Sequence, residues 1–439
     1  MTIRVAYDIS MLCRFYFRHK LEKFGIFRVT EEVLHQMVTH PEIDLTLCRL
    51  CEEMEGDRVY ETLRYYFYLE DRNTFQLPFE DPFASRLGLV NLYKQVYLGR
   101  YAPAFEKLAS RSPRSLYLRG MRKVLSLLQS IDLYKAFRAD RYDIFHSTFL
   151  QLPPRELTGQ TIRVLTVYDL IPVVAPHLVA PHMTQAFQKI LDSIDIHRDW
   201  LVAISEHTKQ EFCEYLKVSP DRVIVAPLAA ADHFYPIEDP ERIQAARHRY
   251  DIPEGEYFLC LATLQPRKNL VHLIRCFIRL IQEQPSLDVN LLLVGHKGWM
   301  YDEIFATVES LTPEIRSRVI MTGHIPDCDI SEIYSGARAF ILPSLYEGFG
   351  LPALEAMQCG TPVISSNVTS LPEVMGDAAL LIDPRDADQL CQAMLTILTD
   401  SALAQELGRR GRERSHQFSW QHCADRVIQT YQQAMAAAG

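Results

Sequence analysis

Short apolar runs alternate with helix-like segments along most of this chain, and this alternation constrains the fold more than any other feature. Runs such as residues 3–10 (IRVAYDIS), 161–169 (TIRVLTVYD) and 289–295 (VNLLLVG) are typical of strands buried on both faces of a sheet. Strands separated by helices pair in parallel through βαβ units. The sequence therefore predicts an α/β fold with parallel sheets.

The runs fall into two groups on either side of residues 235–256, a segment rich in prolines and charges. Such a composition is typical of an interdomain linker. We therefore predict a first domain over residues 1–240, a second over residues 241–418 and a C-terminal helix over residues 419–439. Ligands of parallel sheets bind beyond the carboxyl ends of the strands, so the cleft between two facing domains is the expected site.

The charge balance and the cysteine pattern exclude several classes of protein. With 46 Lys and Arg against 55 Asp and Glu, the net charge of −9 argues against general binding of nucleic acid. The N-terminal residues are typical of a strand rather than a secretory signal, and no apolar run approaches the ~18 residues of a membrane span. Cys48 and Cys51 have no second pair beside them that would complete a zinc site. We expect a cytoplasmic protein without a bound metal.

The most informative segment is residues 340–360 (FILPSLYEGFGLPALEAMQCG), an apolar strand followed by a glycine-containing loop and a helix. Gly348 and Gly350 let main-chain N–H groups approach a ligand, and the start of a helix favours phosphate. Glu347 and Glu355 flank this loop, and carboxylates accept hydrogen bonds from sugar hydroxyls. The pattern predicts a site for a nucleotide sugar. The alternative is that Glu355 only complements the helix dipole.

Two cations precede another predicted helix, for which we expect Asn269 to be the N-cap. Arg267 and Lys268 would be poorly placed at a positive helix end unless an anion lay between them. A leaving nucleoside diphosphate is such an anion, and fixed cations stabilise the charge that it gains. We therefore expect no cofactor and no metal, with the nucleotide diphosphate sugar as co-substrate. The alternative is a pair of exposed loop charges.

The spacing of Glu347 and Glu355, with GFGLP between them, resembles the E-x7-E motif of retaining glycosyltransferases of family 4. These enzymes have the GT-B fold, in which two Rossmann-like domains with parallel sheets face a central cleft. The resemblance implies that Glu347 lies beside the transferred sugar and that Glu355 binds the ribose. It also implies donor contacts from the loop and a diphosphate held by two cations, which here would be Gly348, Phe349 and Gly350, and Arg267 and Lys268.

On the first-domain side, the segment FGIFRV resembles the family's turn into the first helix. The resemblance implies donor contacts from Gly25 and Arg28. An alternative for Arg28 is an ordinary cation on the helix surface. Main-chain contacts to the base are implied around Ile325.

The acceptor side is predicted from polar residues near strand ends. Tyr168 and Asp169 end the run at 161–169, and their side chains should face the cleft. Tyr168 stands where many relatives have His, whereas Asp169 either orients the acceptor hydroxyl or only caps the following turn. His146 and Ser205 are further acceptor-side candidates, with satisfied polar loop residues as the alternative.

Residues 100–141 contain ten Lys or Arg against three acids, with apolar residues at helical spacing. A basic amphipathic segment can bind anionic lipid, which would place the protein on the inner face of the plasma membrane. The alternative is a helix that packs its apolar face into the first domain.

The resemblance implies transfer of a hexosyl group from a nucleotide diphosphate sugar to a hydroxyl of a glycan or lipid-linked acceptor, with the anomeric configuration retained. The GIFRV and VYDLIP segments resemble mannosyl and deoxyhexosyl transferases of polysaccharide assembly. Two alternatives stay open: a sugar-nucleotide epimerase of the same fold, and a catalytically weak glycan-binding homologue.

Overall fold

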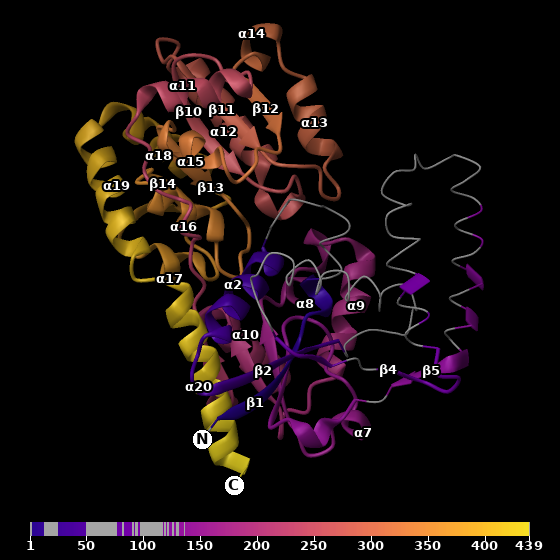
Figure 1. Ribbon diagram of the computed structural model, residues 1–439. Helices are drawn as coiled ribbons and strands as arrows, with labels where there is room; N and C mark the ends of the chain where they lie inside the picture. Colours follow the sequence, from indigo (N-terminus) through magenta and orange to yellow (C-terminus); the bar gives the residue numbers. More distant parts are fainter. Residues whose placement is uncertain are drawn as a thin grey trace.

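The computed structural model describes residues 2–12, 25–49, 77–80, 83–89, 131–135 and 137–438, together with single positions between 92 and 128. Within these residues the chain forms two α/β units that lie one above the other (Figure 1). The first unit is indigo to magenta, and the second is pink through orange to the yellow of α19. This arrangement confirms the predicted fold class.

The first unit contains a parallel sheet with the order β3-β2-β1-β6-β7-β8-β9 in the described part of the chain. Its strands are β1 (Ile3–Asp8), β2 (Ile43–Cys48), β3 (Phe79–Glu80), β6 (Ile144–Ser147), β7 (Ile162–Val167), β8 (Trp200–Ala203) and β9 (Val223–Val225). Its helices are α2 (Ile26–Val38), α7 (Arg155–Thr158), α8 (Ile171–Val174), α9 (Pro181–Asp192) and α10 (Glu206–Leu216). Among the described residues of this unit, three short 3-10 turns are η2 (Ala139–Arg141), η3 (Pro176–Leu178) and η4 (Pro220–Arg222), and β4 (Phe83–Ser85) pairs antiparallel with β5 (Leu133–Lys135).

The second unit contains a parallel sheet with the order β12-β11-β10-β13-β14-β15. Its strands are β10 (Glu256–Leu261), β11 (Val289–Val294), β12 (Val319–Gly323), β13 (Ala339–Leu342), β14 (Val363–Ser366) and β15 (Ala379–Ile382). Its helices are α11 (Pro240–Arg249), η5 (Pro266–Lys268), α12 (Leu270–Glu283), α13 (Asp302–Glu309), α14 (Pro313–Arg316), α15 (Ile330–Ser335), α16 (Leu351–Gln358), α17 (Leu371–Met375), α18 (Ala387–Thr399) and α19 (Ser401–Ser415).

Both sheets have a point at which the strand order reverses. The chain moves from β1 to one edge and returns to β6, and it moves from β10 to one edge and returns to β13. A crevice opens at such a point beyond the carboxyl ends of the strands, because the connections on either side lead away from each other. The two reversal points therefore mark where a ligand can bind.

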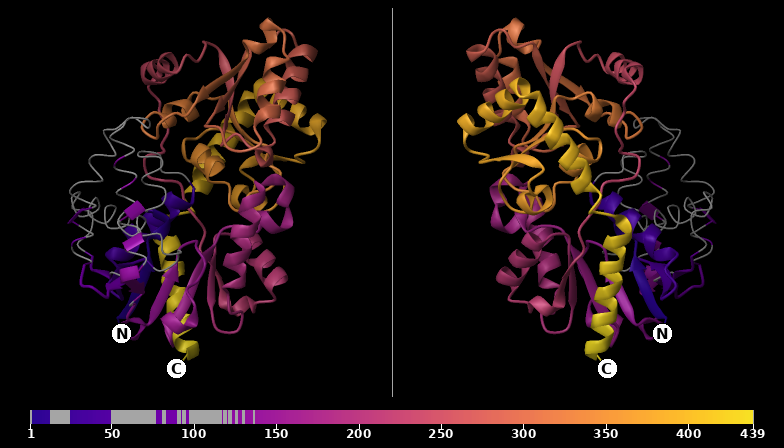
Figure 2. Two further views of the ribbon diagram at one scale, coloured as in Figure 1. Left: turned by 90° about the vertical axis from the view of Figure 1, so that its right-hand side faces the viewer. Right: turned by 90° about the vertical axis from the view of Figure 1, so that its left-hand side faces the viewer.

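Helix α20 (Trp420–Ala438) connects the two units at the end of the chain. It follows α19 of the second unit and then packs against α2 and the strands β7, β8 and β9 of the first. Figures 1 and 2 show this helix, in yellow, running down the side of the first unit. Its buried face includes Val427, Ile428 and Tyr431, so removal of apolar surface from water holds it there.

The proposed linker contains a helix. Pro240 stands at the first position of α11, and the Asp239 carboxylate accepts a hydrogen bond from the Glu241 N–H at 2.9 Å. Helix α11 packs against α15 of the second unit. Proline and charges at 239–241 therefore begin a helix rather than an extended connection. The domain limits at residues 240 and 418 stay predictions.

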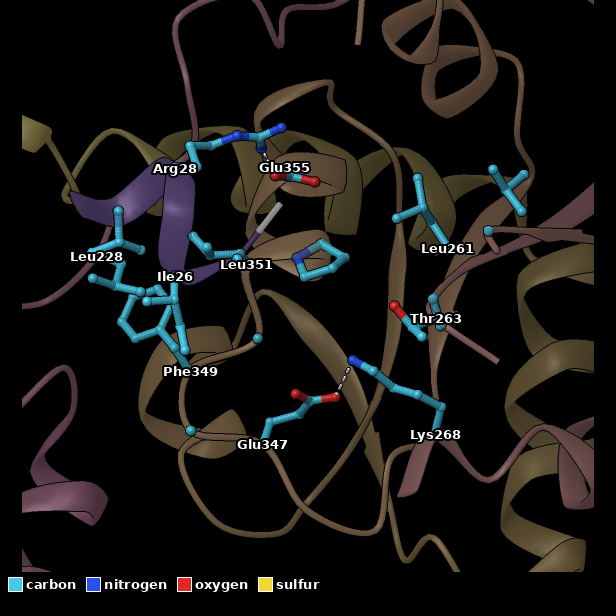
Figure 3. Close-up of a pocket in the computed structure, with 18 of the residues that line it drawn as sticks. Ile26, Arg28, Leu228, Leu261, Thr263, Lys268, Glu347, Phe349, Leu351 and Glu355 are labelled. Atoms are coloured by element: carbon cyan, nitrogen blue, oxygen red, sulfur yellow. Dashed lines mark hydrogen bonds and ion pairs between the residues drawn. The ribbon is translucent and has the colours of Figure 1, made fainter. Parts of the chain in front are cut away.

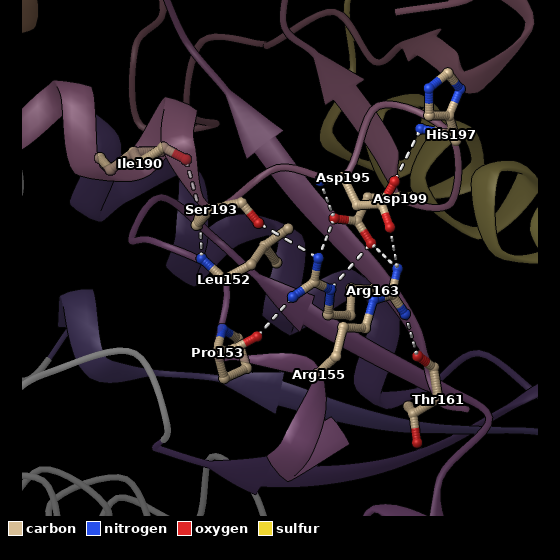
Figure 4. A network of polar contacts seen from close by, with 10 residues as sticks. All are labelled: Leu152, Pro153, Arg155, Thr161, Arg163, Ile190, Ser193, Asp195, His197 and Asp199. Carbon is tan, nitrogen blue, oxygen red and sulfur yellow. Dashed lines mark hydrogen bonds and ion pairs between the residues drawn. The ribbon is translucent and has the colours of Figure 1, made fainter. Parts of the chain in front are cut away.

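A buried ionic network lies at the amino end of strands β7 and β8, away from the reversal points (Figure 4). The Arg163 guanidinium donates to both oxygens of Asp199, at 2.9 and 2.5 Å, and Arg155 also bonds Asp199. Arg163 further donates to the carbonyl oxygen of Pro153 at 2.6 Å. These partners satisfy a fully buried carboxylate, so the network holds loops together rather than awaiting a ligand.

In the described part of the chain, no helix combines the length and the apolar character that a bilayer crossing requires. Most of the basic segment at 100–141 lies outside the described residues, as does Cys51.

Candidate active site

A cavity of about 350 Å³ lies between the two units. It is lined by Gly25, Arg28, Tyr168 and Asp169 of the first unit and by Arg267, Lys268, Ile325, Glu347, Gly348, Phe349, Gly350 and Glu355 of the second. Figure 3 shows Lys268 pointing to Glu347 on one side of the cavity and Arg28 pointing to Glu355 on another. The fold thus brings together residues that the sequence spreads over more than three hundred positions.

Glu347 is held between the two predicted cations. The Arg267 Nη1 atom lies 2.5 Å from Oε2, and the Lys268 Nζ atom lies 2.6 Å from Oε1. The Ser344 hydroxyl donates to Oε1 at 2.6 Å. Burial alone would raise the pKa of Glu347, but the two cations outweigh it and lower the pKa to about 2. Glu347 is therefore ionised at neutral pH.

Lys268 is almost completely buried, with 6% of its surface exposed. Burial lowers the pKa of its ammonium group, and the charge of Glu347 opposes this shift. A buried ammonium group is unfavourable unless an anion faces it. In this structure the anion is Glu347, which excludes the alternative of an exposed loop charge for Lys268.

Asn269 fixes the position of the cations in a way that the sequence did not indicate. It is the N-cap residue of α12, as expected, but its side chain makes no capping hydrogen bond. Its backbone is left-handed, with φ of 57°, and its Nδ2 donates to the carbonyl oxygens of Pro343 and Pro384 at 3.1 and 2.7 Å. The bond to Pro343 ties the start of α12 to the loop that carries Glu347, and the bond to Pro384 ties it to the loop that follows β15.

Contacts within the protein constrain the loop that contains Gly348 and Gly350. Gly350 is the N-cap of α16 and has φ of 100°, a conformation that favours glycine. At Gly348, a Cβ atom would stand 2.2 Å from the carbonyl oxygen of Tyr168. Gly348 is therefore required because the backbone of the first unit passes close to it.

Arg28 crosses the cleft from α2 and is buried, so the interpretation as a surface cation is wrong. Its Nη1 donates to Glu355 Oε1 at 2.5 Å, and its Nη2 donates to Asp327 at 2.8 Å. The Tyr334 hydroxyl lies 3.1 Å from the other oxygen of Glu355. Burial raises the pKa of Glu355 although Arg28 opposes the shift. Glu355 therefore has partners beyond the dipole of α16.

Asp169 follows β7 and lines the cavity. Its Oδ1 accepts a hydrogen bond from the Ile171 N–H at 3.1 Å, so it also caps the following turn. Burial raises its pKa to about 6, against the opposing charge of Arg267. The neighbouring Tyr168 has its ring 5.7 Å from that of Phe149, and burial raises the pKa of its hydroxyl. Tyr168 is thus a neutral, mainly buried residue at the cavity wall.

Two acceptor-side candidates do not reach this cavity. His146 lies within β6, where its ring nitrogens are 2.6 Å from the Tyr431 hydroxyl and 2.8 Å from that of Thr166. Burial lowers its pKa to about 3. Ser205 caps α10 by accepting a hydrogen bond from the Thr208 N–H at 3.1 Å. The structure therefore corrects both acceptor-side assignments, because secondary structure and α20 use these polar groups.

Several cavity residues were not predicted. Asp327 follows β12 and bonds Arg28, whereas Gly295 and His296 follow β11 at the same edge of the sheet. A Cβ atom on Gly295 would stand 2.0 Å from the carbonyl oxygen of Ala262. Gly295, the last residue of the run at 289–295, was the sequence signal that could have indicated this loop. Among the described residues, no cluster of three or more His, Cys, Asp or Glu has the arrangement of a metal site.

Comparisons with known proteins agree with this geometry. The family model of glycosyl transferases group 1 matches residues 243–414. O-antigen chain mannosyltransferase B of Escherichia coli is 33% identical over 289 residues, which cover 66% of this chain and 74% of that protein. Serotype-specific mannosyltransferase WbdA of Escherichia coli is 33% identical over 285 residues, which cover 64% of this chain and 34% of WbdA, so the match spans about a third of that protein.

The fold comparison extends over the whole chain. Sucrose-phosphate synthase from Thermosynechococcus elongatus has a TM-score of 0.61 at 19% identity, with 99% of this chain and 100% of that structure covered. This likeness shows a two-domain GT-B fold. The family model and the mannosyltransferase relative, 74% of which this chain covers at 33% identity, show that the chain belongs to the group 1 glycosyl transferases.

Proposed function

We propose that this glycosyltransferase binds a nucleotide diphosphate sugar in the cleft and transfers its hexosyl group to a hydroxyl with retention, as in family 4. Glu347 and Glu355 then form its E-x7-E motif. The observation that carries this proposal is the pair of cations held on Glu347 at the wall of the cavity. A diphosphate is negatively charged, as is the Glu347 carboxylate that these cations already face. The N-terminus of α16, which favours phosphate, lines the same cavity.

We assign the ribose and the base of the donor to residues on the other walls of the cavity. Glu355 accepts hydrogen bonds from the ribose hydroxyls, and Tyr334 positions one of its oxygens. The loops at Gly295 and Ile325 line the same cavity and offer main-chain groups to the base. Gly25 and Arg28 face the donor from the first unit.

In the proposed reaction, the bond between the anomeric carbon and the phosphate oxygen breaks while the acceptor oxygen approaches on the same face. Arg267 and Lys268 stabilise the charge that develops on the diphosphate. Glu347, ionised at neutral pH, stabilises the oxocarbenium-like sugar without bonding to it covalently. The departing phosphate oxygen takes the acceptor proton, and Asp169 orients the acceptor hydroxyl. No metal is required, because protein cations balance the leaving group.

Mannose is the proposed sugar, and GDP-mannose is the proposed donor. Both Escherichia coli relatives are named mannosyltransferases, and one is named for the O-antigen chain. The acceptor is then a glycan or a lipid-linked glycan of polysaccharide assembly.

The location that we propose is the inner face of the plasma membrane, with anionic lipid as the partner. Five apolar side chains are largely exposed at described positions of the basic segment: Tyr117, Val124, Leu127, Leu128 and Ile131. Exposed apolar groups within a cationic segment favour an anionic bilayer surface. Flotation with anionic liposomes at low salt is expected, and failure to float would contradict this location.

The function is tested by a thermal-shift screen of UDP-, GDP-, ADP- and dTDP-sugars, followed by incubation with the labelled donor. A ligand at 100 times its Kd should stabilise the protein by about 2.7 kcal/mol. Transfer with an α-configured product, or slow donor hydrolysis without acceptor, is the expected result. An isomerised donor would indicate an epimerase, and binding without turnover would indicate a binding protein.

A further inference from the structure

A second cavity, of about 520 Å³, lies where the chain passes between the two units. One wall is the connection from β9 to α11, at residues 230–236, and another is the junction of α19 and α20, at residues 415–421. Figure 1 shows α19 and α20 meeting between the units. We call this space the hinge cavity. Of the residues that line it, only Phe234 also lines the donor cavity among the described residues.

The hinge cavity is lined by groups of mixed chemistry. Glu32 and Asp232 supply carboxylates, and Arg412 supplies a guanidinium group. The amide of Gln36 and the hydroxyl of Ser419 add further polar groups. Three other lining residues already donate within the protein: Gln358 to the carbonyl oxygens of Ala231 and Phe234, Gln421 to Asp425, and Ser415 to the carbonyl oxygen of Arg412. The opposite charges leave no strong preference for an anion or a cation. A ligand with many hydroxyls, each able to donate and accept, suits this wall.

Aromatic rings complete the lining. Tyr235 is 46% exposed, Phe418 lies just before α20, and Trp420, the first residue of α20, is buried, with 5% of its surface exposed. The faces of such rings carry partial negative charge, which attracts the C–H groups of a sugar ring. Rings together with carboxylates and amides form the kind of surface that binds carbohydrate.

The hinge cavity is also connected to the donor site. Arg28, Glu32 and Gln36 stand four residues apart on one face of α2. Arg28 serves the donor cavity, whereas the other two line the hinge cavity. The Arg28 guanidinium lies 5.4 Å from the centroid of Phe234, the ring shared by both cavities. A ligand in the hinge cavity therefore acts on the element that positions Arg28.

We propose that the hinge cavity is a second carbohydrate-binding site that takes a short neutral oligosaccharide, separate from the donor and acceptor positions in the cleft. Its choice of ligand rests on the proposed function, because the growing glycan is the oligosaccharide that the enzyme would meet. Bound there, a segment of glycan would keep the product on the enzyme between transfers and favour the position of α2 that presents Arg28 to the donor.

The probe is an α-linked mannotriose, titrated by calorimetry into the wild-type chain and into Arg412→Ala and Asp232→Ala variants. Each substitution removes one polar partner, and each should weaken binding by about tenfold. Arg409→Ala is the matched control. Arg409 lies three residues before Arg412 on α19 but bonds Glu406 and Glu413 on its own helix, so this variant should bind as the wild type does.

Binding that is unaffected by the hinge variants, that is abolished by saturating GDP, or that is absent altogether would overturn the proposal. GDP-mannose binding is measured in the same preparation by thermal shift. Loss of mannotriose binding with intact GDP-mannose binding refutes only the hinge site. Hinge-dependent mannotriose binding without GDP-mannose binding supports the hinge site and refutes the proposed donor.

Discussion

Arg28 and Glu355, 327 positions apart in the sequence, are joined by a hydrogen bond of 2.5 Å across the cleft. Each side chain is at least nine-tenths buried, so neither charge is compensated by bulk water. The pair holds the two units together at the position that we assign to the ribose. Donor binding must therefore exchange this contact for contacts with the nucleotide.

The Glu355→Gln substitution should weaken donor binding by roughly tenfold or more, because a hydrogen bond to a charged acceptor contributes about 1.5–3 kcal/mol. Turnover at saturating donor should change less. Calorimetry with the nucleotide measures the effect. Glu303→Gln is the control, since Glu303 pairs with Arg275 on the surface. Equal affinity in the wild type and in Glu355→Gln would contradict the ribose assignment.

The Lys268→Ala substitution should lower kcat by about 10²–10³, with a smaller change in the donor KM, because the charge that Lys268 faces grows in the transition state. Steady-state kinetics separate the two effects. Lys297→Ala is the matched control, as Lys297 lies over the rings of Tyr301 and Phe305. A variant with wild-type kcat would show that Lys268 serves only to pair Glu347.

The Gly348→Ala substitution should prevent close approach of the two units. The added Cβ would stand 2.2 Å from the Tyr168 carbonyl oxygen, a backbone atom that cannot move alone. Misplacement of reacting groups by about 1 Å can cost about 100-fold in rate. Activity should fall to that extent, and small-angle scattering should show a larger radius of gyration. Gly120→Ala, which meets no atom within 4 Å, should change neither quantity.

Asp169 should produce the acidic limb of the pH profile. Because burial raises its pKa to about 6, the carboxylate loses its charge as the pH falls through 6, and kcat/KM should fall about tenfold per unit below that value. Asp169→Asn should lower kcat/KM at neutral pH and abolish the limb near pH 6. An unchanged limb in this variant would assign the ionisation to another group.

Treatment with EDTA should leave transfer activity intact, because Arg267 and Lys268 balance the leaving diphosphate in place of a divalent cation. Activity is measured after dialysis against chelator, with and without added Mg²⁺ or Mn²⁺. Activity that disappears and is restored by either ion would contradict the metal-free mechanism.

The second unit was predicted well because its strands are continuous apolar runs. The run at 289–295 contains β11, and the apolar strand expected at the start of 340–360 lies in β13. In the first unit, β2 was missed because its Asp and Thr interrupt the apolar run (IDLTLC), and His146, expected near the end of a strand, lies within β6. A buried polar residue in a strand is recognisable only when its partner is known, and here the partner is Tyr431, 285 residues away.

Part of the lining of the cavity was predicted from local sequence patterns. Glu347, Glu355 and the two cations are marked by turns and helix starts, so short sequence segments indicate them. The sequence did not indicate the contacts between the first and the second unit. The bond of Arg28 to Glu355 and the approach of Tyr168 to Gly348 depend on how two sheets face each other, which no local pattern records.

The most direct test of the central claim is a crystal structure of the protein with GDP-mannose or its unreactive analogue. The account predicts the diphosphate oxygens within hydrogen-bond distance of Arg267 and Lys268, the ribose on Glu355, and the Glu347 carboxylate turned to the hexose. A nucleotide bound outside this cleft would contradict the account. So would a complex in which Arg267 and Lys268 stay paired with Glu347 and the phosphates lie far from both cations.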